Sequence, residues 1–195
     1  MGIDLVVMSL GDEWASRSDD ALRWLSSLDA LVPFGERPLP FDRALSERAF
    51  AEAPGALPGQ RRPAVDRAVH DLQERLSLRF DRAIAWTDRP SEETYLGQVA
   101  PRSVLAVHEW VTKNGRDRTP NFAAWDIHNM YLPVELPTVL IGQPWPLGSA
   151  PALRREVRLL RDELGDRDDV GYLLEKIEKA CTDAIETERV LIVSG

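Results

Sequence analysis

The stretch 137–164 constrains the fold of this chain more than any other part of its sequence. A short apolar run at 139–141 stops at a glycine, and after a loop with two prolines an amphipathic helical pattern begins at Ser149. This order predicts a strand, a turn and a helix that Ser149 caps at its start and Gly165 ends. Because open α/β sheets bind ligands in loops that follow a strand, the loop 142–149 is the first place to look for a site.

Apolar strands and amphipathic helices alternate along the rest of the chain. Like 139–141, residues 3–8 and 190–193 are almost wholly apolar, which is typical of strands covered by helices on both faces. A further short strand is predicted at 82–87. Helical patterns occupy five segments, 18–28, 63–76, 101–113, 149–164 and 169–187. The alternation within 101–113 also fits a strand. We therefore expect an α/β (or α+β) fold with a mixed sheet of about four to five short strands covered by amphipathic helices.

The length of 195 residues fits one globular domain, residues 1–195. Within it, residues 33–63 hold six of the fourteen prolines, interrupted by a helical stretch around 41–52, and form a proline-rich excursion. Such an excursion is commonly a surface connection between core elements. The alternatives are a lid or a partner-binding arm.

Charge and hydropathy narrow the class of protein. The net charge of −8 disfavours nucleic acid as a partner, because binding to its backbone needs a basic surface. No apolar run approaches the ~20 residues that span a bilayer, and the N-terminal residues lack the basic leader of a signal peptide. The single cysteine, Cys181, excludes an internal disulfide and lies on an apolar helical stripe, where we expect it to be inert. We expect a cytoplasmic protein that binds neither nucleic acid nor membranes.

Residues 119–150 carry only two charged side chains, Asp126 and Glu135. A stretch so poor in charge is expected in a core or in an apolar interface, which leaves a homodimer open. Its first part, 119–132, fits a helix capped by Thr119 about as well as it fits an extended segment.

If this first part is extended, Asp126 and His128 point the same way. A carboxylate beside an imidazole raises the imidazole pKa and orients the ring as a general base, so these two residues are the catalytic candidates of an enzyme. Trp125 and Tyr131 would then wall a pocket for a small ligand. The alternative is an Asp–His pair that only ties down a loop, since the segment offers no obvious nucleophile.

The loop 142–149 is not a phosphate-binding loop of the Walker kind, because it contains two prolines and no lysine. The backbone N–H groups of Gly148 and Ser149 lie at a predicted helix start, where one anionic group can bind. Arg154 lies one turn along, and Trp145 would form a wall of the site. The alternative is a capped helix start that binds nothing.

No metal site and no cofactor is predicted. His108-Glu109 resembles the start of a zinc-peptidase helix, but Thr112 stands where that motif needs its second histidine. The spacing of His108 from His70 and His128 gives no support to a three-histidine site.

Two functions of different classes remain. The first is a non-catalytic protein-interaction domain of the inhibitor or immunity-protein kind, whose acidic surface steers it toward a basic partner. Six tryptophans are many for this length, and Trp14 and Trp24 are the predicted partner contacts. The second is a small-molecule-binding protein or small enzyme that uses Asp126 and His128 near the loop 142–149. The absence of a catalytic motif favours the first.

Overall fold

The computed structural model describes residues 2–16, 63–90, 93–125, 128–141, 146–165 and 168–195. They belong to two compact units, each of which is described by itself. The sheet unit comprises residues 1–8, 93–141 and 145–195, and the α4 unit comprises residues 9–92 and 142–144. The predicted helix 18–28 and the predicted excursion, apart from Pro63, lie outside the described residues. That residues 1–195 form a single domain stays a prediction.

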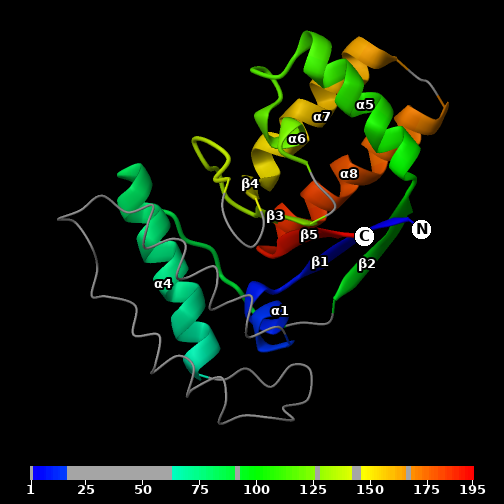
Figure 1. The fold of residues 1–195 in the computed structure, drawn as a ribbon. Coiled ribbons are helices and arrows are strands. Elements are labelled where there is room, and N and C mark those ends of the chain that lie inside the picture. Colours follow the sequence, from blue (N-terminus) through cyan, green and yellow to red (C-terminus); the bar gives the residue numbers. More distant parts are fainter. Residues whose placement is uncertain (1, 17–62, 91–92, 126–127, 142–145, 166–167) are drawn as a thin grey trace. The chain divides into compact units, whose positions relative to one another are not determined.

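Five strands form one mixed sheet in the sheet unit, as the sequence predicts (Figure 1). Their order is β2-β1-β5-β3-β4, in which β3 and β4 run parallel and the other neighbours antiparallel. The predicted strands 3–8 and 190–193 are confirmed as β1 and β5, whereas β2 was not predicted. The strands are β1 (Ile3–Met8), β2 (Thr94–Val99), β3 (His128–Leu132), β4 (Leu147–Ser149) and β5 (Val190–Ser194).

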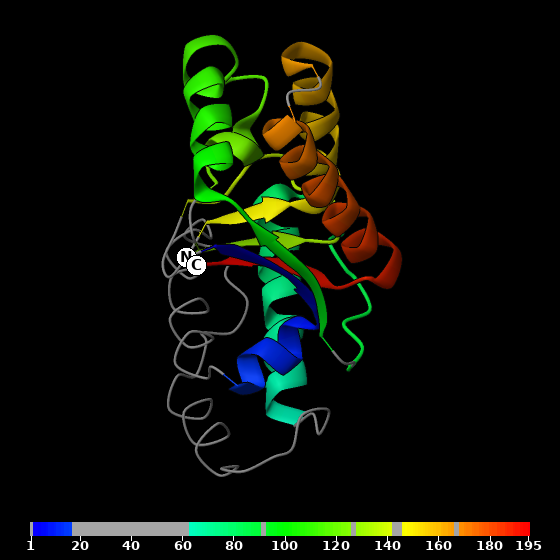
Figure 2. The ribbon, with the colours of Figure 1, turned by 90° about the vertical axis from the view of Figure 1, so that its right-hand side faces the viewer.

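Four helices of the sheet unit lie on one face of this sheet (Figure 2). They are α5 (Pro101–Asn114), α6 (Pro120–Ala123), α7 (Ala150–Leu164) and α8 (Asp168–Thr187). The apolar stripes that predicted the three long helices are buried in one core with the inward side chains of β1. Along the described ranges, no helix combines the length and the apolar character needed to cross a membrane.

The caps of α7 are confirmed. The Ser149 side chain accepts a hydrogen bond from the Ala152 N–H at 3.2 Å, as an N-cap should. At the other end, Gly165 has a φ of 66° and its N–H donates to the Arg161 carbonyl, so a residue with a Cβ would be strained there.

The predicted strand at 139–141 is wrong. Leu140 forms only an isolated bridge with Leu147, and Ile141 is 81% exposed. The strand that leads into α7 is instead β4, which pairs with β3 over three residues. Gly148 permits this pairing, because a Cβ there would lie 2.5 Å from the Tyr131 ring. A strand of three residues is too short to give a periodic signal in the sequence.

Both interpretations of 119–132 hold for part of the segment. Its first residues form the short helix α6 and its last residues form β3. Phe122, Tyr131 and Leu132 are all fully buried, so the charge-poor stretch contributes core rather than surface at these positions. A homodimer stays a prediction.

The α4 unit contains α1 (Leu10–Ser16) and α4 (Pro63–Phe80), which contact each other. Pro63 begins α4, as predicted, and the stripe of Val65, Val69, Leu72 and Leu76 is buried. The buried carboxylate of Asp88 accepts hydrogen bonds from the Leu10 and Gly11 N–H groups, both at 2.8 Å. Asp88 therefore satisfies two of the backbone donors at the start of α1.

The predicted strand at 82–87 is also wrong, although the segment has the burial pattern of one. Ile84, Trp86 and Asp88 are buried, while the residues between them are exposed. In the described part of the chain its backbone is bound by side chains of α4 and not by a neighbouring strand: Ile84 N–H donates to Ser77 Oγ, and Gln73 Nε2 donates to the Trp86 carbonyl. Period-two burial therefore arises here without a sheet.

Candidate functional site

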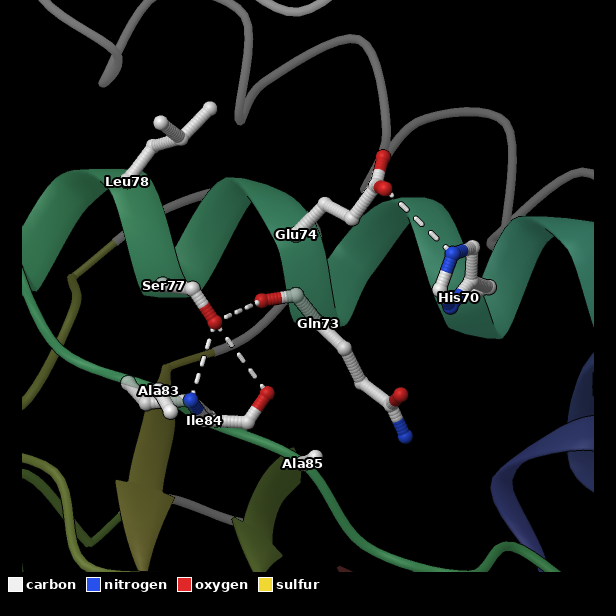
Figure 3. A pocket seen from close by; sticks show the side chains of 8 residues that line it. All are labelled: His70, Gln73, Glu74, Ser77, Leu78, Ala83, Ile84 and Ala85. Carbon is white, nitrogen blue, oxygen red and sulfur yellow. Dashed lines mark hydrogen bonds and ion pairs between the residues drawn. The ribbon is translucent and has the colours of Figure 1, made fainter.

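An open groove of about 450 Å³ runs along α4 and the segment that follows it (Figure 3). We call it the α4 groove. The described residues that line it all belong to the α4 unit: His70, Gln73, Glu74, Ser77, Leu78, Ala83, Ile84 and Ala85. Leu78 stands outside the buried stripe of α4 and is 39% exposed, so the groove offers apolar surface to a binding partner.

The polar side chains of the groove are already engaged within the protein (Figure 3). Ser77 Oγ donates to the Gln73 carbonyl at 2.7 Å and accepts from Ile84 N–H at 2.9 Å. Gln73 Nε2 donates to the Trp86 carbonyl at 2.9 Å, and His70 Nε2 lies 3.3 Å from Glu74 Oε1 in an exposed pair. His70 and Ser77 are seven residues apart, about 10 Å along the helix axis, so they form no nucleophile–base pair. The groove can hold an apolar group, and its side chains are not arranged for acid–base chemistry.

In the predicted anion site at the start of α7, the Ser149 N–H is bound by another group of the protein. Ser149 N–H donates to Asn121 Oδ1 at 2.9 Å, and the Ser149 hydroxyl caps the helix. Asn121 Nδ2 in turn donates to the buried carboxylate of Glu156 at 2.7 Å. That carboxylate also accepts from the Asn121 and Phe122 N–H groups, at 3.1 and 2.8 Å, and so holds the start of α6. The Ser149 N–H is therefore not available to a ligand.

Burial dominates the electrostatics of this network. It raises the pKa of Glu156, while the hydrogen bonds from Asn121 and Phe122 act in the opposite direction. Burial likewise raises the pKa of Tyr131 well above its ordinary value. The Tyr131 hydroxyl donates to the Asn121 carbonyl at 3.2 Å. These groups tie α6, α7 and β3 together.

The other ligand-binding candidates are placed as follows. Trp125 is buried and stacks on Phe122 with ring centroids 5.5 Å apart, so it packs in the core with Tyr131. Gly148 is buried against the Tyr131 ring. Arg154 is half-buried, and its Nε has no hydrogen-bond partner among the described residues. Trp145 lies outside them.

A smaller cavity of about 290 Å³ lies beside the same network. Two arginines line it, and both are bound to surface glutamates: Arg118 to Glu163 at 3.2 Å, and Arg155 to Glu135 through both of its terminal nitrogens. The buried carboxylate of Glu156 also lines the cavity. Three carboxylates thus offset two guanidinium groups, which gives the cavity no preference for an anion.

Of the two catalytic candidates, the structure describes only His128. His128 is the exposed first residue of β3 and lies opposite Ser194 of β5. Asp126 lies outside the described residues. The Asp126–His128 pair therefore stays a prediction.

Three of the four described tryptophans are buried, and the fourth, Trp110, is half-buried against the core. Trp14, a predicted partner contact, is 0% exposed, so the expected exposure is not found. Trp86 and Trp125 are buried as well. Trp24, the other predicted contact, lies outside the described residues.

The next question is whether histidine and cysteine side chains of the described residues could bind a metal ion or react. No three His, Cys, Asp or Glu side chains come together there in a group that could hold a metal ion. His108 is bound through Nε2 to the Trp125 carbonyl at 2.9 Å. Burial raises the pKa of the Cys181 thiol far above neutral pH, which keeps it protonated and unreactive.

Comparison with protein-family models, with curated proteins and with solved structures finds no match to this chain.

The sequence analysis did not predict the α4 groove. The sequence features that could have indicated the groove are weak. Leu78 is a single apolar residue outside the stripe of α4, and residues 82–87 have a strand pattern with no obvious partner strand.

Proposed function

We propose that this chain is a non-catalytic protein-interaction protein that binds its partner through the α4 groove. The observation that carries the proposal is the combination of exposed apolar surface with polar side chains that are all engaged internally. Such a surface gains free energy by burying an apolar side chain of a partner.

The same observation argues against a small molecule as the ligand of the groove. Sites for small ligands enclose most of the ligand and aim a few free polar groups at it. The α4 groove is open. The Ser77 hydroxyl donates to the Gln73 carbonyl, and the Gln73 amide donates to the Trp86 carbonyl, so both donors are already used within the protein. A partner side chain needs neither enclosure nor orienting groups, because the rest of the interface holds it in place.

The charge of the chain suggests the chemistry of the partner. A net charge of −8 accelerates association with a basic protein and slows association with an acidic one. The proposal is therefore an inhibitor- or immunity-like domain in the cytoplasm that binds a basic protein.

The test compares two exposed leucines. The tagged chain is purified from its host under native conditions, and any stoichiometric partner is identified, produced separately and titrated by calorimetry. Leu78→Arg places a charge in the groove, and Leu105→Arg places the same charge on α5, where the leucine is 62% exposed and no part of the groove. We expect Leu78→Arg to weaken binding by about tenfold or more, as at an interface hot spot, and Leu105→Arg to leave it nearly unchanged.

Two results would contradict the proposal. One is equal binding by both variants, which would place the interface away from the groove. The other is a chain that yields no stoichiometric protein but carries a small-molecule mass in native mass spectrometry.

A further inference from the structure

Among the described residues, the segment after α4 is bound along one edge only. In an extended chain, successive residues direct their N–H and C=O groups to opposite edges. Ile84 and Trp86 direct theirs to Ser77 and Gln73 of α4. The backbone groups of Ala83 and Ala85 therefore face the opposite edge, and they form no hydrogen bond with any described residue.

The side chains along this edge are compatible with close approach by another backbone. Ala83, Ala85 and Thr87 are exposed and small. Residues 83–87 include no charged side chain and no proline or glycine. Open strand edges are normally guarded by lysine, by proline or by a bulge, and this one has none of these within 83–87.

We propose that residues 83–87 receive an extended segment of the partner protein by β-strand addition, with Ala83 and Ala85 as the main-chain contacts. This inference rests on the proposed function and specifies how the partner is recognised. Free donors and acceptors that recur every second residue, about 6.6 Å apart, match the repeat of another extended polypeptide.

The groove explains how such contact becomes specific. Ala83 and Ala85 line the α4 groove as well as carrying the free backbone groups. A side chain of the added segment that lies beside them on the outward face therefore borders the α4 groove. The partner segment is expected to be uncharged at this position, with a β-branched or aromatic residue next to Ala85.

Amide hydrogen exchange on the full chain tests the inference directly. The probe is the set of peptides selected on the wild-type chain from a phage-displayed random library. In the free chain, we expect the Ala83 and Ala85 amides to exchange fast and the Ile84 amide to be protected by Ser77. Saturation with a selected peptide should slow exchange at Ala83 and Ala85 by at least tenfold.

Three results would overturn strand addition. The Ala83 and Ala85 amides would already be protected in the dilute free chain, or they would stay fast in the saturated complex. Alternatively, they would become protected in the free chain only as its concentration rises, which would assign the edge to a second copy of this chain.

A pair of variants provides an independent test. Ala85→Pro removes one donor from the edge, whereas Ala85→Val retains it and favours an extended backbone. We expect Ala85→Pro to weaken peptide binding about tenfold or more and Ala85→Val to preserve it. Equal binding by the two variants would overturn the inference, and if Ala85→Pro does not fold, the exchange measurement on the wild-type chain still decides.

Failure of this inference can be told apart from failure of the proposed function. If Leu78→Arg abolishes partner binding while the Ala83 and Ala85 amides stay fast, the groove is the interface but strand addition is wrong. If Leu78→Arg leaves partner binding unchanged, the proposed function itself is wrong.

Discussion

The start of α7 and the segment after α4 treat their backbone polar groups in opposite ways. At α7, Ser149 N–H is bound by Asn121, and Glu156 closes the start of α6, so the network is internally complete. After α4, the backbone is bound along one edge, while the backbone groups of Ala83 and Ala85 on the other edge form no hydrogen bond with the residues that the structure describes. The sequence predicted a ligand site at the first region and an ordinary strand at the second.

The comparison separates stability from binding. A closed polar network in a core is costly to break, because each group that loses its partner is left without hydrogen bonds. An open edge costs little to alter, since water satisfies its groups in the free protein. Substitutions at the start of α7 should therefore change the free energy of unfolding, and substitutions along the α4 groove should change affinity.

Glu156→Ala should have the largest effect on stability. It leaves the Asn121 side-chain amide and the Asn121 and Phe122 N–H groups without their acceptor. Water from the adjacent cavity can accept some of these hydrogen bonds in place of Glu156. We therefore expect a loss of about 3 kcal/mol in the free energy of unfolding, measured in urea. Glu163→Ala, on the exposed side of the same helix, is the matched control and should change it by less than about 0.5 kcal/mol. Equal losses in the two variants would show that the network does not hold α6.

Gly148→Ala should be the next most harmful change. The new Cβ would lie 2.5 Å from the Tyr131 ring and 2.9 Å from Asn121 Oδ1, both of which are fixed in the buried network. We expect a loss of about 2 kcal/mol from overpacking, measured by the same unfolding assay. At Gly115 a Cβ would meet the half-buried Trp110 at 3.2 Å, so Gly115→Ala should cost less. A larger loss at Gly115 would contradict this account of the α7 start.

Titration of Glu156 should change the free energy of unfolding with pH, by less than the Gly148→Ala substitution does. Its pKa is raised in the folded chain, mainly by burial, above the ordinary value of 4.5. The folded state then binds the proton more tightly than the unfolded state, so the contribution of Glu156 favours folding below pH 4.5 and declines as pH rises through the folded pKa. Glu156→Gln lacks this titration. The difference in unfolding free energy between wild type and Glu156→Gln should therefore shift against the wild type as pH rises from 4 toward neutrality, and a difference that is flat with pH would refute the shift.

The four long helices α4, α5, α7 and α8 and the strands β1 and β5 could be predicted from sequence because their signals are local. Pro63 and Ser149 mark helix starts, Gly165 marks an end, and the stripes between them have helical spacing. β1 and β5 are apolar runs that pair with neighbours in the sheet. β4 could not be predicted, because three residues give no period and its pairing depends on a glycine packed against Tyr131.

The candidate site could not be predicted because it depends on which groups meet. Residues 82–87 have a strand pattern, yet whether they join a sheet depends on partners elsewhere in the chain. Along one edge, the side chains of Ser77 and Gln73 of α4 form the hydrogen bonds that a neighbouring strand would otherwise form. In the same way, Ser149 and Gly148 had the composition of an anion site, and Asn121, nearly thirty residues earlier, binds the Ser149 N–H. Local pattern determines conformation, and tertiary contacts determine which polar groups remain for a partner.

Leu78→Arg should have the smallest effect on stability, although it is expected to have a large effect on binding. Leu78 is 39% exposed and lies outside the buried stripe of α4, so an arginine can extend into water with little loss of packing. We expect the free energy of unfolding to change by less than about 0.5 kcal/mol, which thermal and urea unfolding can resolve. A variant that loses its partner and remains as stable as wild type would assign the loss to the interface itself. If Leu78→Arg instead destabilised the chain as much as Glu156→Ala, the leucine would be a core residue, and the contrast between a closed and an open region would fail at its open end.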